Sequence, residues 1–204
     1  MEIQERIVGK AHELFMRYGI RSVSMDEVAT HLGMSKKTIY QFYADKEALV
    51  EDVIEIEVSA NQAECTIHKE KSENAIHEVF MAVDMLLELL TKMNPAVIFD
   101  LEKYHPIAFK KYNDYKNNFL YALIKENIEW GKKEGYYREE VQADIMARFR
   151  LASIFLIFNP DLFPHGKHSL PVLVTEITDN FLYGLATVKG QKLIQKYKQQ
   201  RQKP

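Results

Sequence analysis

The sequence is poor in residues that cross-link, bend or anchor a chain. Among its 204 residues is a single cysteine, Cys65, which excludes an internal disulfide framework and a zinc site built from several cysteines. Only eight glycines and six prolines are present, and no strand-like alternation of apolar and polar residues is seen, so an all-α protein is expected. No apolar run reaches the roughly 20 residues that a membrane-spanning helix needs. The amphipathic N-terminus also lacks the apolar segment of a signal peptide. We therefore expect a soluble cytoplasmic protein with no membrane partner.

Excess charge is also absent from the chain as a whole. The net charge is −2, so any interaction with DNA must depend on local charge. Residues 47–102 contain thirteen acids and three bases, whereas residues 188–204 contain six bases and no acid. We interpret residues 188–204 as a basic, disordered, solubilising tail. Attraction to DNA or to the acidic region is the alternative for this segment.

Signals of catalysis are missing too. The seven histidines show no compact metal-ligand spacing, so we expect no metal. The sequence contains no glycine-rich phosphate loop and no pattern typical of a catalytic triad. Cys65 has no activating base near it in the sequence. We therefore expect neither a cofactor nor an enzymatic activity.

The stretch from Ser24 to Lys46 does carry a specific pattern, two short helices separated by a glycine. Ser24 followed by Glu27 fits a capping box, in which each side chain accepts the backbone N–H of the other residue. Gly33 suits the left-handed position that ends the first helix, and Ser35 is placed to cap the second. Two helices with a glycine-containing turn form a helix-turn-helix, whose second helix enters the major groove of DNA.

This pattern, with the helix before it, resembles the N-terminal DNA-binding domain of the TetR/AcrR family of transcriptional regulators. The resemblance covers about the first quarter of the chain, and the rest agrees only in its helical plan. It implies that a ligand-binding, dimerising helical domain follows the head. Lys37, Gln41 and Phe42 depart from residues frequent in the family, so no operator sequence is carried over. The matching residues are Ala11, Phe15, Gly19, Ser24, Val28, Ala29, Gly33, Ser35, Thr38, Tyr40, Tyr43, Lys46, Glu47 and Leu49.

The second helix of the pair begins with hydroxyl groups and cations, which suit phosphate oxygens and guanine edges. Gln41 offers the donor and acceptor that pair with an adenine edge, whereas Ile39 and Tyr43 are expected in the core. An ordinary solvated helix face is the alternative. The predicted DNA-binding residues are Ser24, Ser35, Lys36, Lys37, Thr38, Tyr40, Gln41 and Lys46.

Helical periodicity and the resemblance together divide the chain into three regions. We expect a three-helix helix-turn-helix DNA-binding domain over residues 1–46, a larger helical ligand-binding and dimerisation domain over 47–187, and the basic tail over 188–204. Expected features include a helix over 3–18, a connection over 66–72, a long helix from Ile107 to Gly131 or Gly135, nearly continuous helix over 139–158 and a last helix from 170 to about 187.

Methionine and aromatic residues recur through the middle of the chain, either as ordinary core or as the lining of an apolar ligand pocket. The candidate pocket residues are Met81, Met85, Phe99, Tyr112, Tyr115 and Trp130.

Residues 145–158 and 170–186 are apolar over more than one helix face, which suggests a partner surface. Two such helices from each subunit would form a four-helix bundle across a two-fold axis. A buried hairpin in a monomer is the alternative. The candidate interface residues are Ile154, Phe155, Phe158, Ile177, Phe181 and Leu185.

These features predict a ligand-responsive transcriptional regulator, a homodimeric repressor that a small-molecule effector releases from a near-palindromic double-stranded DNA operator. Two other classes are open. A helical scaffold protein with an accessory DNA-binding head would show a stable heteromeric partner. A small-molecule-binding or catalytic helical bundle would need a titratable pair in a pocket. Neither of these explains the pattern from Ser24 to Lys46.

Overall fold

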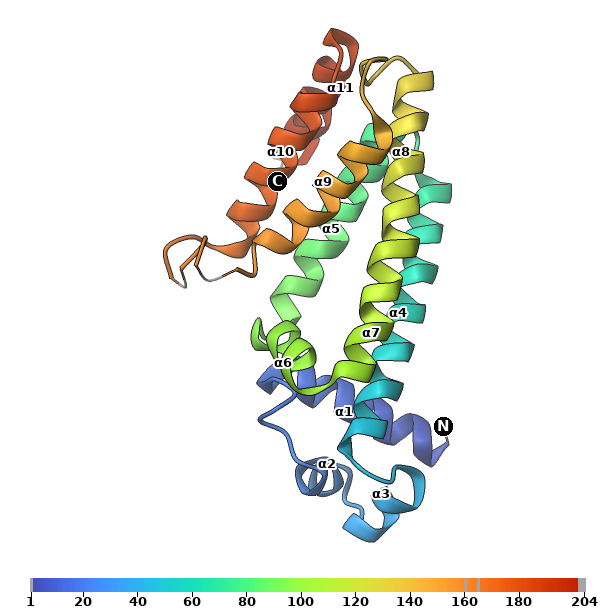
Figure 1. The fold of residues 1–204 in the computed structure, drawn as a ribbon, viewed down its shortest axis with the longest axis vertical. Helices are drawn as coiled ribbons and strands as arrows, with labels where there is room; N and C mark the ends of the chain where they lie inside the picture. The colour runs from blue at the N-terminus through green and yellow to red at the C-terminus, as the bar shows by residue number, and fades with distance from the viewer. Residues whose placement is uncertain (1, 160, 165, 202–204) are drawn as a thin grey trace. The chain divides into compact units, whose positions relative to one another are not determined.

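The computed structural model describes residues 2–159, 161–164 and 166–201, and this part of the chain is predominantly helical (Figure 1). It contains no β-strand, only an isolated bridge between Tyr137 and Ala186, which confirms the expected all-α class. None of its helices is long and apolar enough to span a bilayer. The helices are α1 (Ile3–Tyr18), α2 (Met25–Leu32), α3 (Lys36–Phe42), α4 (Lys46–Lys71), α5 (Ala75–Lys92), α6 (Ala96–Tyr104), α7 (Pro106–Asp114), a π-helical stretch η1 (Tyr115–Leu120), α8 (Tyr121–Lys133), α9 (Ala143–Leu156), α10 (Leu170–Leu185) and α11 (Val188–Arg201).

The chain forms two compact units that interleave along the sequence. The first unit contains residues 1–62 and 90–115, and the second contains residues 63–89 and 116–204. Helices α4 and α5 each contribute residues to both units. The first unit therefore holds the predicted head together with α6 and α7.

The core of the first unit forms where apolar helix faces meet. In α1 the buried positions follow the helical period, so one face is apolar and the other stays in solvent. Helix α2 packs against α1 and α3 packs against α2, and both add their own buried residues (Figure 1). The main contributors are Ile7, Ala11, Leu14 and Phe15 from α1, Val28 and Ala29 from α2, Ile39 from α3, Leu49, Val50 and Val53 from α4, and Val97 and Leu101 from α6.

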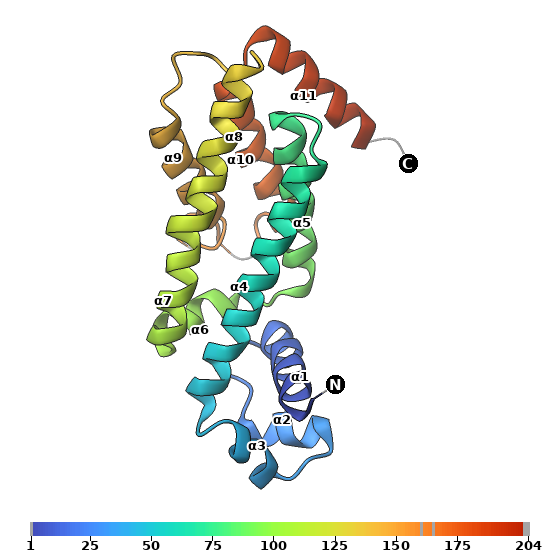
Figure 2. The same cartoon turned by 90° about the vertical axis from the view of Figure 1, so that its right-hand side faces the viewer.

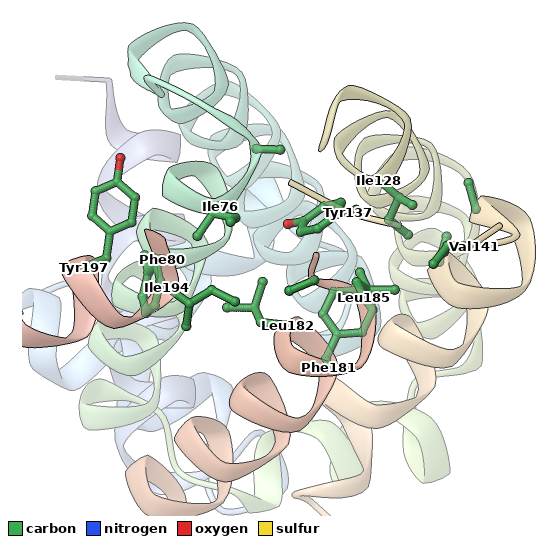
Figure 3. Close-up of a cluster of buried hydrophobic side chains, with 14 residues drawn as sticks. Ile76, Phe80, Ile128, Tyr137, Val141, Phe181, Leu182, Leu185, Ile194 and Tyr197 are labelled. Carbon is green, nitrogen blue, oxygen red and sulfur yellow. The ribbon is translucent and has the colours of Figure 1, made fainter. Parts of the chain in front are cut away.

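The core of the second unit collects side chains from α5, α8, α10 and α11 around Tyr137 (Figure 3). Tyr137 lies between α8 and α9 and is 1% exposed. Its ring packs directly on Gly131, where an added Cβ would lie 2.2 Å from a ring carbon, so no larger residue fits there without a shift. The labelled partners are Ile76, Phe80, Ile128, Val141, Phe181, Leu182, Leu185, Ile194 and Tyr197.

The basic tail is not disordered where the structure describes it, so that interpretation was wrong. Residues 188–201 form α11, which lies against the start of α5 (Figure 2). Gly190, Ile194 and Tyr197 are buried, and the Asn74 side-chain amide donates to the Tyr197 hydroxyl at 2.8 Å. These three positions form a narrow buried face of α11. The many cations around them obscure its apolar pattern in the sequence. The tail residues 202–204 lie outside the described residues.

Several helix limits also differ from those expected. Helix α4 continues unbroken to Lys71, so the connection predicted over 66–72 was wrong. Its polar sequence weakens the amphipathic signal but contains good helix formers. Helix α9 begins at Ala143 rather than near 139, because the preceding residues carry Tyr137 into the core. The long helix predicted from Ile107 corresponds to α7, η1 and α8, with a π-helical stretch that periodicity did not indicate.

Candidate nucleic-acid interface

The helix-turn-helix has the local structure that its sequence predicts. Ser24 Oγ accepts the N–H of Glu27 at 3.2 Å, and a Glu27 carboxylate oxygen accepts the N–H of Ser24 at 2.6 Å. Gly33 adopts a left-handed conformation with φ 63° and ends α2. Ser35 Oγ accepts the N–H of Thr38 at 3.1 Å and caps α3. The capping prediction is confirmed at both helices.

Helix α3 has one anchored face and one exposed face. Ile39 is fully buried and Tyr43, just after the helix, is 4% exposed, as expected for core positions. The Tyr43 hydroxyl donates to the Asp52 carboxylate of α4, and burial raises the pKa of Tyr43, so the hydroxyl keeps its proton. These contacts fix the orientation of α3. Its exposed residues are Lys36, Lys37, Tyr40, Gln41 and Phe42.

The two lysines that begin α3 have different surroundings. Lys36 Nζ lies 2.7 Å from Asp26 Oδ1 of α2, and this hydrogen bond raises the pKa of Lys36. Lys37 forms no ion pair with any residue that the structure describes. A phosphate or base would therefore compete with Asp26 for Lys36, whereas Lys37 could bind a phosphate or base without first breaking an ion pair.

Four of the other predicted DNA-binding residues, Ser24, Ser35, Thr38 and Lys46, already make contacts within the fold. The Ser24 hydroxyl donates to the Glu27 carboxylate at 2.9 Å, and Thr38 Oγ1 lies 2.8 Å from Ser35 Oγ. Lys46 Nζ donates to the Ile20 carbonyl at 2.6 Å, and burial lowers the pKa of Lys46. Contact of these residues with DNA stays a prediction.

The turn before the helix-turn-helix rests on a buried carboxylate that the sequence analysis did not single out. Asp100 of α6 is 6% exposed and accepts the N–H of Arg21 at 2.8 Å. A second bond links the same regions, from the N–H of Asn94 to the Met16 carbonyl at 2.6 Å. An acid within the apolar run AVIFDL was the available signal, since such a buried acid needs a partner.

The six candidate pocket residues are divided between the two units. In the first unit, the Tyr112 and Tyr115 rings lie 6.4 Å apart, while Phe99 is 56% exposed beside Tyr104. In the second unit, Met81 and Met85 are half-buried on α5, and Trp130 packs against the core around Tyr137. A ligand site that uses these residues stays a prediction. Among the described residues, no group of three or more histidine, cysteine or acidic side chains is placed to hold a metal ion.

The candidate interface residues need a correction. Phe181 is 3% exposed and Leu185 is 0% exposed within a single chain, so both belong to the core of the second unit. Their assignment to a subunit interface was wrong, because neither has surface left for a partner. Ile154, Phe155, Phe158 and Ile177 are half-buried, and their role in an interface stays a prediction. The structure adds Ile145, Phe149 and Val172, each more than 50% exposed.

Comparison with known proteins agrees with this geometry. Residues 7–53 match the family model described as bacterial regulatory proteins, tetR family. The chain is 30% identical over 164 residues to YvaF of Bacillus subtilis, an uncharacterized HTH-type transcriptional regulator, covering 80% of this chain and 76% of YvaF. A transcriptional regulator from Saccharomonospora viridis in complex with choline aligns with a TM-score of 0.76 and 20% identity, over 90% of this chain and 97% of that one. The fatty acid degradation regulator FadR from Bacillus halodurans aligns with a TM-score of 0.69 and 17% identity, over 89% and 95% of the two chains.

Proposed function

Because the chain belongs to the TetR family of bacterial transcriptional regulators, we propose that it is a homodimeric repressor released from its operator by a small molecule. The observation that carries the proposal is the division of α3, which buries Ile39 and exposes Lys36, Lys37, Tyr40 and Gln41. We propose no enzymatic activity, because binding alone explains repression and release, and we place the protein in the cytoplasm beside the DNA it reads.

In this proposal, α3 lies in the major groove, where its exposed side chains reach base edges and phosphates. Lys37 makes the strongest contact, since no ion pair has to be broken first. Lys36 exchanges Asp26 for the DNA, which reduces its net contribution. Gln41 hydrogen-bonds an adenine edge. Ser24, Ser35, Thr38, Tyr40 and Lys46 complete the predicted DNA-facing set.

Two copies of α3 would read two half-sites about one helical turn apart, roughly 34–36 Å. The exposed apolar residues of α9 and α10, Ile145, Phe149 and Val172, support the assembly of two copies through the second unit. The predicted four-helix bundle would use these residues with Ile154, Phe155, Phe158 and Ile177.

The effector is proposed to bind within the helical region beyond the head. The similar regulator from Saccharomonospora viridis was solved in complex with choline, a small molecule. Effector binding and DNA binding must then oppose each other by the same coupling free energy. Helix α4 contributes to both units and provides a covalent route for this coupling.

The test is selection of bound sequences from a random library of duplex DNA. The proposal predicts enrichment of two inverted half-sites whose centres lie about 10 base pairs apart. Enrichment of an isolated half-site would contradict the dimeric arrangement. Absence of any enriched sequence would contradict the operator-binding function itself.

A further inference from the structure

The second unit buries a cation without giving it an anion. Arg150 of α9 is 6% exposed, and its Nη2 donates to Thr178 Oγ1 of α10 at 2.9 Å. The guanidinium carbon lies 5.1 Å from the centre of the Phe181 ring. Arg150 forms no ion pair with any carboxylate of the described residues, and its side chain donates to the Thr178 hydroxyl alone. The hydroxyl and the aromatic ring are neutral, so the charge has no partner of opposite sign.

This arrangement keeps its charge at neutral pH. Burial lowers the pKa of Arg150 to about 10, which still leaves the guanidinium protonated at pH 7. Two acids on neighbouring helices, Asp179 and Glu78, are engaged elsewhere. Asp179 forms an ion pair with Lys198, and Glu78 accepts a hydrogen bond from Asn127 at 2.7 Å. A buried charge without a counter-charge destabilises a fold, so its presence requires another explanation.

The guanidinium also remains accessible at its edge. Among the described residues, the side-chain atoms that are sealed from solvent and lack a hydrogen bond are Glu47 Oε1 and His68 Nδ1. The Nε and Nη1 atoms of Arg150 donate to no described residue, but they are not among these solvent-inaccessible atoms. They therefore keep some accessible surface. Planar guanidinium N–H groups match the geometry of a carboxylate, which accepts two of them at once.

We propose that Arg150 and Thr178 form the polar end of a binding site for the carboxylate of a small amphipathic molecule. The apolar body of that molecule packs against the surrounding faces of α9 and α10, beginning at Phe181. A ligand with a cationic head is disfavoured, because it would meet a buried positive charge. This inference rests on the proposed function, since it names the chemical class of the effector.

A second copy of the chain is a poorer source of the carboxylate. The exposed apolar residues Ile145 and Phe149 of α9 are the surface that a partner would meet. Arg150 belongs to the buried face of the same helix, with Ala147 and Leu151. A small carboxylate needs only the accessible edge of the guanidinium, which is a smaller target than a partner chain requires.

The experiment measures the melting temperature, Tm, of the full chain with straight-chain carboxylates from butanoate to hexadecanoate. The matching alcohols and trimethylammonium compounds are tested in parallel. We expect at least one carboxylate to raise Tm by about 5 °C near saturation, and more than its matched compounds do. The gain should vanish in Arg150→Met, shrink in Thr178→Val and persist in Arg148→Met, which removes an exposed arginine of the same helix. An equal gain in Arg150→Met, or no carboxylate better than its alcohol, would overturn the proposal.

The ligand-free variant supplies a second, independent readout. Removal of an unpaired buried charge should raise the Tm of Arg150→Met by about 2–4 °C. A lower Tm would show that Arg150 is needed for the fold and would overturn the inference. DNA binding then separates the two proposals. If a carboxylate binds through Arg150 and DNA affinity is unchanged, the site stands and ligand-controlled release fails. If only neutral or cationic compounds release DNA, release stands and the carboxylate site fails.

Discussion

In the first unit, the Glu57 carboxylate lies 2.7 Å from the His12 imidazole. In the second unit, two buried charged groups hydrogen-bond to neutral partners. Glu78 accepts a hydrogen bond from the Asn127 amide, and Arg150 donates one to the Thr178 hydroxyl. The hydrogen bond from His12 lowers the pKa of Glu57. Burial has the opposite effect in the second unit, where it raises the pKa of Glu78 and lowers that of Arg150. The fold thus favours the ionised form of the first glutamate and disfavours the ionised forms of Glu78 and Arg150.

This difference suggests that the first unit holds α3 in a fixed orientation, whereas the second unit is suited to bind a ligand. In the first unit, polar contacts hold the turns and helices that orient α3, as Asp100 holds the N–H of Arg21. In the second unit, a cation is retained although its charge is not neutralised within the chain. Stability at a fixed protein concentration and DNA affinity can therefore test the two units separately.

The largest expected loss of stability tests how tightly the second unit is packed. Loose packing would be a simpler explanation for its charged groups that lack a partner of opposite charge. A Cβ on Gly190 would lie 2.2 Å from the Tyr136 carbonyl oxygen, a backbone atom that cannot easily move. We expect Gly190→Ala to reduce the free energy of unfolding by about 3 kcal/mol in urea denaturation. Gly184→Ala is the control, because a Cβ there meets no atom within 4 Å, and it should be neutral or slightly stabilising. Equal, small effects for both would indicate loose packing.

The next effect concerns the frame of the first unit. Asp100→Ala removes the buried carboxylate that accepts the N–H of Arg21 and should lower the free energy of unfolding by about 2 kcal/mol. DNA affinity should fall as well, because the turn leading into α2 loses its support. Asp84→Ala, which removes an exposed partner of Arg201, should cost less than about 1 kcal/mol. Similar losses for the two variants would contradict the supporting role of Asp100.

A smaller effect is expected when Glu57 and Glu78 are each replaced by glutamine, but its sign should differ between the two variants. At pH 7, Glu57→Gln should lower the free energy of unfolding by about 1 kcal/mol and Glu78→Gln should raise it by about the same amount. The lowered pKa of Glu57 gives stability that is present above its ordinary value of 4.5 and is lost as the pH falls through the folded value. The raised pKa of Glu78 gives a cost that is present at pH 7 and disappears as the pH falls towards 4.5.

Urea denaturation at a series of pH values distinguishes these windows. The difference between wild type and Glu78→Gln should close first as the pH is lowered, and the difference for Glu57→Gln should close below pH 4.5. Effects of the same sign at pH 7 would remove the contrast between the two units.

The elements that the sequence predicted best are those whose signals are local. Ser24, Gly33 and Ser35 each specify a cap or a turn through contacts within four residues, so the helix-turn-helix could be predicted from its own residues. Helix α11 could not, because its buried face is defined only by packing against distant residues such as Asn74. The same reason explains the error at Phe181 and Leu185, since an apolar helix face does not reveal whether its own chain or a partner covers it.

The functional roles of polar residues followed the same rule. The exposed start of α3 was predicted from residue types, but the ion pair between Lys36 and Asp26 depends on how α2 and α3 cross. The sequence alone gave no reason to assign Arg150 a role, because arginines are common on helix surfaces. Only its burial beside Thr178, without an acid, makes it a candidate for binding.

The most direct test of the central claim is the salt dependence of DNA binding for lysine variants of α3, measured by fluorescence anisotropy on the selected operator. Lys37→Ala should weaken binding by about 1–3 kcal/mol, roughly 5- to 150-fold, and Lys36→Ala should weaken it less because Asp26 competes for that lysine. A lysine that contacts phosphate should also reduce the slope of log affinity against log salt by about 1. The control is Lys71→Ala, at an exposed lysine near the end of α4, and it should bind as wild type does. Wild-type affinity and salt dependence in Lys36→Ala and Lys37→Ala alike would contradict α3 as the DNA-reading element.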